Sequence, residues 1–98
     1  MEKRFVKIWL NSADVEETSD GRHEIIHKGK EVCLFITPET SALFFAAYQP
    51  RGLRTVVGEG RACTLFINGG GGYLLYGSIR ELTNTIYKHF ENTGETDV

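Results

Sequence analysis

Four side chains suited to binding lie close together between residues 48 and 61. They are Tyr48, Arg51, Arg54 and Arg61. Tyrosine and arginine are enriched at the energetic centres of interfaces, and the planar guanidinium group binds phosphate or carboxylate through paired hydrogen bonds. This group therefore predicts a contact surface for an acidic protein partner or for a nucleic-acid backbone. The structural alternative is that the arginines only solvate strand ends and turns.

Four consecutive glycines occupy positions 69–72, and consecutive backbone amides can cradle an anion. Phosphate-binding loops place such glycines between a strand and a helix, with a lysine and a hydroxyl residue at fixed offsets. Here residues 73–76 form a β-rich run, and no Gly-Lys-Ser or Gly-Lys-Thr occurs. We therefore expect a hairpin turn, whose tip at Gly70 and Gly71 can close on a partner.

The cysteines and histidines are the remaining candidates for catalysis or metal binding. Cys33 and Cys63 lie in apolar, strand-like runs, whereas reactive cysteines need partly exposed, electropositive surroundings. His23 and His27 are four positions apart in a predicted strand, which separates them by about 13 Å, too far for one metal ion. We expect buried reduced thiols, with no catalytic residue, metal or cofactor. An internal Cys33–Cys63 disulfide, or a zinc site using both thiols, is the alternative.

Length and charge set limits on the function. With 98 residues, a net charge of −2 and 41% hydrophobic residues, the chain is expected to form one packed domain. The charge is segregated: residues 1–10 carry +2, residues 11–20 carry −4 and residues 91–98 carry −3. Because acidic and basic residues nearly balance over the whole chain, strong non-specific binding to nucleic acid is not expected. No apolar run approaches the ~20 residues of a membrane span, and no signal-like segment is present, so we expect a cytoplasmic protein.

The β-rich runs predict the strands of a sheet. A loop over residues 11–22 should follow the first strand and end in the Asp20-Gly21 turn. Gly29 lies between two β-rich runs and predicts a tight hairpin at residues 28–30. The predicted strands cover residues 4–10, 23–27, 31–37, 53–57, 61–68 and 73–76.

Two helices are considered. Ser78 and Glu81 fit the capping box that begins a helix. The apolar positions that follow at three- and four-residue steps predict one stripe facing a sheet; they are Ile79, Leu82, Ile86, Tyr87 and Phe90. Thr37 and Pro38 favour a second, short helix near 38–48, although its apolar run fits a buried strand as well.

Together these patterns predict an α+β fold with an antiparallel sheet of about five or six strands and a C-terminal amphipathic helix packed on one face. Residues 1–90 would form a single globular domain, and residues 91–98 an acidic C-terminal tail. We expect a small non-enzymatic regulatory or inhibitory module that binds a protein partner and forms a homodimer through a sheet edge. The alternative is a nucleic-acid-binding regulator that uses the arginine-rich edge. An enzyme or small-ligand domain would require a deep pocket that brings a histidine to a cysteine or carboxylate.

Overall fold

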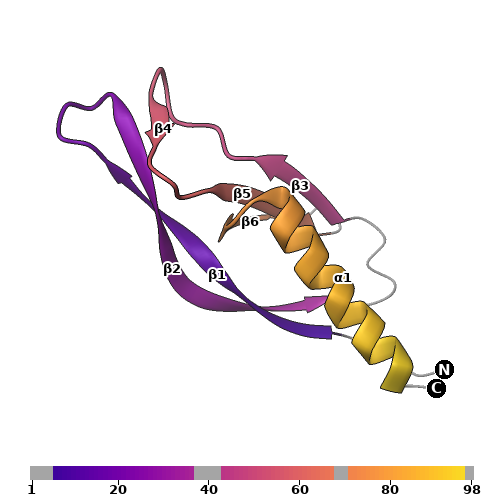
Figure 1. Cartoon of the computed structure of the whole chain (residues 1–98). Helices are drawn as coiled ribbons and strands as arrows, with labels where there is room; N and C mark the ends of the chain where they lie inside the picture. Colours follow the sequence, from indigo (N-terminus) through magenta and orange to yellow (C-terminus); the bar gives the residue numbers. More distant parts are fainter. Residues whose placement is uncertain (1–5, 37–42, 68–70, 97–98) are drawn as a thin grey trace.

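The computed structural model describes residues 6–36, 43–67 and 71–96. These residues form a curled six-stranded sheet and one helix (Figure 1). The elements are β1 (Val6–Glu17), β2 (His23–Ile36), β3 (Leu43–Ala47), β4 (Thr55–Val57), β5 (Ala62–Ile67), β6 (Gly72–Tyr76) and α1 (Ile79–Thr96). The α+β class and the C-terminal helix are therefore confirmed.

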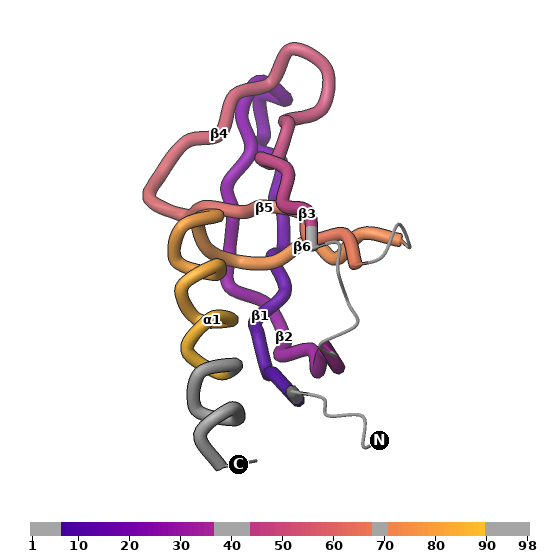
Figure 2. The backbone as a smooth tube through the Cα atoms, turned by 90° about the vertical axis from the view of Figure 1, so that its right-hand side faces the viewer, coloured from indigo at the N-terminus to yellow at the C-terminus, as the bar shows by residue number. Residues whose placement is uncertain are grey.

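The sheet has the strand order β3-β5-β6-β1-β2-β4. It is mixed, because β4 pairs in parallel with the start of β2, so the expectation of a purely antiparallel sheet is wrong at this edge. Residues 48–54 carry the chain from β3 back to the edge of β2, where β4 then runs in the same direction as β2. In Figure 2 the paired strands β1 and β2, here called the β1–β2 ribbon, extend well beyond α1. The molecule measures 56 × 23 × 20 Å.

The β1–β2 ribbon is longer than the sequence predicts. The expectation of a loop over residues 11–22 is wrong up to Glu17, and the expectation of a hairpin at residues 28–30 is wrong because these residues lie within β2. β1 continues to Glu17, and Gly29 lies inside β2. Gly29 and Lys30 lie opposite Ser12, where the register shifts by one residue in a β-bulge. A Cβ atom on Gly29 would lie 2.8 Å from the Ser12 Oγ. This glycine therefore permits close approach of the strands and does not reverse the chain.

The reversal occurs at the Asp20-Gly21 turn, as predicted. Gly21 has a φ of 70°, and its amide donates to the Thr18 carbonyl at 2.9 Å. Asp20 accepts from the Thr18 hydroxyl at 2.6 Å and from the Arg22 amide at 2.9 Å, and these hydrogen bonds lower the pKa of its carboxyl group. The side chains of Asp20 and Thr18 thus hold the tip of the β1–β2 ribbon, since the Thr18 Oγ also accepts from the His23 amide at 3.2 Å.

The helix expected near 38–48 is wrong where the structure describes that segment. Residues 43–47 form β3, which pairs antiparallel with β5. Phe44 lies opposite Phe66, with ring centroids 6.0 Å apart, and Phe45 packs against the core. Burial against β5 thus outweighs the helix propensity of the alanines. Residues 37–42 lie outside the described residues.

The predicted β5–β6 hairpin and the Ser78 cap are both present. The Glu81 amide donates to the Ser78 Oγ at 3.1 Å, and the Ser78 hydroxyl donates to the Glu81 carboxylate at 2.9 Å. This second contact replaces the expected bond to the Ser78 amide. α1 continues to Thr96, so the predicted helix end near residue 90 is too early. Backbone hydrogen bonds can extend a helix beyond its apolar stripe.

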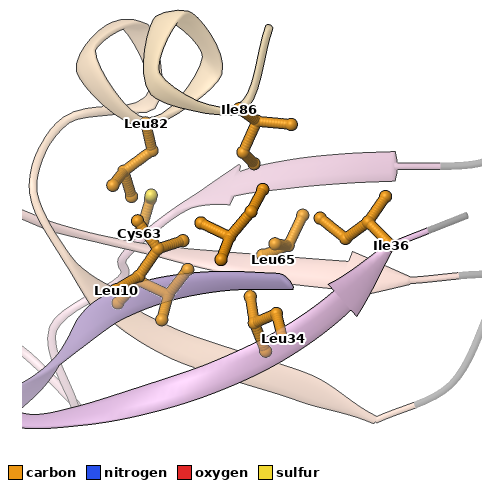
Figure 3. Packing of buried hydrophobic residues seen from close by; sticks show 9 residues of the cluster. Leu10, Leu34, Ile36, Cys63, Leu65, Leu82 and Ile86 are labelled. Carbon is orange, nitrogen blue, oxygen red and sulfur yellow. The ribbon is translucent and has the colours of Figure 1, made fainter. Parts of the chain in front are cut away.

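The core lies between α1 and one face of the sheet (Figure 3). Leu82 and Ile86 of α1 are buried, whereas Tyr87 and Ile79 are exposed. The helix therefore packs on one face, as predicted, through a narrower stripe than the sequence indicates. The buried cluster consists of Ile8, Leu10, Leu34, Ile36, Cys63, Leu65, Leu75, Leu82 and Ile86.

Candidate functional site

Two surfaces lie on the sheet away from the α1 core. Side chains alternate along a strand, so Lys7 and Trp9 point away from the face that carries Ile8 and Leu10. Lys7 pairs in register with Phe35, and the Lys7 Nζ lies 5.6 Å from the Trp9 ring centroid and 6.0 Å from that of Phe35. The side chains of Trp9 and Phe35 are 55% and 58% exposed. We call Lys7, Trp9 and Phe35 the aromatic patch.

The second surface is a pocket at the far end of the β1–β2 ribbon. Beyond the bulge, Val15 pairs with Ile26 and Glu17 pairs with Glu24. Residues 48–54 lie over these strands and close one side of a hollow of about 350 Å³. We call this hollow the polar pocket; its lining includes Val15, Glu17, Glu24, Tyr48, Arg51 and Arg54.

A partly buried hydrogen bond holds Tyr48 against the β1–β2 ribbon. The Tyr48 hydroxyl donates to the Glu24 carboxylate at 2.6 Å, and Glu24 is only 2% exposed. Burial, this hydrogen bond and the negative charge of Glu24 raise the pKa of Tyr48, while the charges of Arg51 and Arg54 lower it in part. Tyr48 therefore stays protonated at neutral pH and acts as a donor.

The two arginines of the polar pocket have different roles. The Arg54 Nη2 donates to the Glu17 carboxylate at 2.7 Å, and its Nε donates to the Gly21 carbonyl at 3.1 Å. Arg54 therefore ties the connection 48–54 to the tip of the β1–β2 ribbon. The exposed Arg51 lines the same pocket, and no residue in the described ranges forms an ion pair with its side chain.

The structure thus brings together three of the predicted binding residues, Tyr48, Arg51 and Arg54. Arg61 is exposed and does not line the pocket; its carbonyl accepts from the Gly77 amide at 2.8 Å. Gly71 is exposed, and a Cβ atom there would have no neighbour within 4 Å in the described part of the chain. Gly70 lies outside the described residues.

Sequence reasoning did not identify Trp9, Glu17 or Glu24 as members of a site. Trp9 could have been found, because it lies between the core positions Ile8 and Leu10 and must therefore face the other side of a strand. Glu24 carries no such signal. Its burial depends on residues 48–54, which the chain reaches only after β3.

The thiols and histidines do not converge on a reactive centre in the described part of the chain. Cys63 is buried, which raises the pKa of its thiol, whereas Cys33 is only half-buried and pairs in register with Trp9. The expectation of a fully buried Cys33 is therefore wrong, and both thiols are free. His27 contacts Glu16 at 2.7 Å on the surface. Within the described ranges, no three metal-ligand side chains lie together.

We predict that Tyr48→Phe lowers the free energy of unfolding by about 1–3 kcal/mol at neutral pH, because it leaves the Glu24 carboxylate buried without its donor. The raised pKa of Tyr48 means that its contribution is complete below about pH 10, the value in an unfolded chain, and is lost as the pH rises through the folded-state pKa. Urea unfolding of both proteins from neutral to alkaline pH measures this difference. A difference that stays constant or grows above about pH 10 would contradict the assignment.

In the described residues, no helix has the length and apolar character needed to cross a membrane. Comparisons of the chain with protein-family models, curated proteins and solved structures give no match, so its function has to be argued from the two surfaces above.

Proposed function

We propose that the chain is a non-enzymatic regulatory or inhibitory module that binds a protein partner through the aromatic patch. The observation that carries this proposal is the exposure of Trp9, 55% of whose surface is open on the sheet face opposite the α1 core. Tryptophan is the residue type most enriched at interface hot spots, and its exposure in a free chain leaves apolar area that a partner can bury.

The surroundings of Trp9 favour an acidic partner segment that carries an apolar side chain. Lys7 extends over the Trp9 and Phe35 rings, and residues 1–10 carry a net charge of +2. A carboxylate can pair with Lys7 while a neighbouring apolar group covers the rings. Residues 11–20, with a net charge of −4, give a second copy of the chain such an acidic segment. The homodimer and the cytoplasmic location expected from the sequence are part of this proposal.

We predict that Trp9→Ala weakens binding of the protein partner about tenfold or more, because it removes the centre of the contact. The measurement is capture from nuclease-treated lysate of the native host, followed by titration of the purified partner; size-exclusion chromatography with light scattering tests the second copy. Tyr87→Ala is the matched control, because Tyr87 is 63% exposed on α1, and it should bind as the unmodified protein does. Equal partner affinity for all three proteins would refute the aromatic patch as the binding surface.

The nucleic-acid alternative draws on the exposed Arg51 and Arg61. Arg54 contributes less than the sequence suggests, because its guanidinium group already pairs with Glu17. Binding of an oligonucleotide that falls steeply between low and moderate salt, and that an Arg51→Ala, Arg61→Ala variant loses, would favour this alternative. In that case, treating the lysate with nuclease would also abolish the capture of bound material by the unmodified protein.

A further inference from the structure

We propose that the polar pocket binds a small zwitterion that carries one ammonium and one carboxylate group, as a free amino acid does. In this arrangement Glu24 binds the ammonium group and Arg51 binds the carboxylate. The proposal is independent of the aromatic patch, which lies on the other half of the β1–β2 ribbon. In addition to the proposed protein partner, the chain would bind a small molecule.

Glu24 is the first reason for this assignment. Its side chain is almost fully buried, and a buried carboxylate is costly unless a cation or several donors compensate it. In the described part of the chain, its only hydrogen bond comes from the neutral Tyr48 hydroxyl, and no cation lies within ion-pair distance. An ammonium group in the pocket would supply the missing positive charge.

The second carboxylate oxygen of Glu24 is the atom available to such a ligand. No described residue donates to it, yet no buried polar side-chain atom in the described ranges lacks a partner. This oxygen must therefore keep some exposure, and the cavity that Glu24 lines is the polar pocket. Glu24 thus offers the hollow an acceptor from a largely buried side chain.

Arg51 supplies the complementary charge. Glu17 and Arg54 line the same hollow but neutralise each other at 2.7 Å, which leaves Arg51 as the cation of the lining that forms no ion pair with a described residue. A guanidinium group binds a carboxylate through two parallel hydrogen bonds. Asp14 adds a further negative charge to the lining and favours an ammonium group near it.

The size and the apolar part of the lining fit a ligand of this class. The hollow of about 350 Å³ lies at the small end of the range for ligand pockets. Ala13, Val15 and Leu74 give it an apolar portion, which can contact an aliphatic side chain. Most ligand pockets combine such apolar area with a few polar groups that fix the orientation.

Isothermal titration calorimetry of the full chain with the standard L-amino acids tests the proposal. At least one should bind with a Kd of about 1 mM or tighter. The ligand is then compared with two analogues, one lacking the carboxylate and one lacking the amine. Arg51→Ala should weaken binding of the amino acid about tenfold without affecting binding of the amine analogue, which lacks the carboxylate. Glu24→Gln should weaken binding of both ligands about tenfold or more.

Arg61→Ala is the matched control, because it removes an exposed arginine outside the pocket and should leave binding unchanged. Glu24→Gln retains an acceptor for Tyr48; if it nevertheless unfolds, the comparison of Arg51→Ala with Arg61→Ala still decides the carboxylate contact. The absence of binding by every amino acid would overturn the proposal. Equal effects of the Arg51 and Arg61 variants, or an amine analogue that binds as tightly as the amino acid, would also overturn it.

Discussion

Leu65→Ala is expected to lower the free energy of unfolding by about 3–4 kcal/mol. Leu65 is fully buried in β5, within the cluster that α1 covers. Removing its side chain forfeits apolar burial and leaves a cavity that the surrounding strands close only in part. Since domains of this size are stable by about 5–15 kcal/mol, the variant should lose a large share of its stability.

Urea unfolding followed by circular dichroism measures the effect of Leu65→Ala. Leu53→Ala is the matched control, because Leu53 is 102% exposed in the turn between Arg51 and Arg54. The same chemical change there should alter stability by less than about 0.5 kcal/mol. If both leucine variants lost similar stability, the buried cluster would be wrongly placed.

Gly60→Ala should destabilise the fold by about 3 kcal/mol, the upper end of the range for overpacked sites. Gly60 lies in the connection between β4 and β5, and a Cβ atom there would overlap the backbone carbonyl of Ile26 in β2. A backbone atom in a paired strand cannot turn aside as a flexible side chain does. The connection must therefore move, which also uncovers Ile26, now 5% exposed.

Gly71→Ala provides the matched control for Gly60→Ala. The added methyl group at Gly71 meets no atom of the described residues within 4 Å, and Gly71 does not have a positive φ. The free energy of unfolding of this variant should lie within about 0.5 kcal/mol of that of the original protein. Thermal unfolding of the two glycine variants tests the prediction, which fails if Gly60→Ala melts at the temperature of Gly71→Ala.

The parts of the fold that the sequence predicts correctly are those with local signals. The β5–β6 hairpin follows from two β-rich runs around a glycine turn, and Ser78 with Glu81 marks the start of α1. Gly29 misled the prediction because a glycine that reverses a chain and a glycine that permits a bulge have the same local pattern. The expectation of a helix at residues 43–47 is wrong, since their strand state depends on pairing with β5, and that pairing has no local signal.

The candidate sites show the same division. Tyr48, Arg51 and Arg54 lie within seven positions of one another, so their types could be noticed together. Their partners Glu17 and Glu24 come from the β1–β2 ribbon, across the pairing of β4 with β2. Sequence reasoning therefore found the basic half of the polar pocket and missed the acidic half, which decides the chemistry.

The seam between β1 and β6 has a mechanical consequence. Within the described residues, one register pair, Ser12 with Leu75, joins these two strands, whereas β1 and β2 pair along nearly their whole length. The sheet thus consists of two well-paired halves, here called leaves, that meet at the contact between β6 and β1. Helix α1 packs across this contact onto both leaves. Amide protons of Ser12 and Leu75 should exchange with deuterated solvent through openings that leave the interior of each leaf protected.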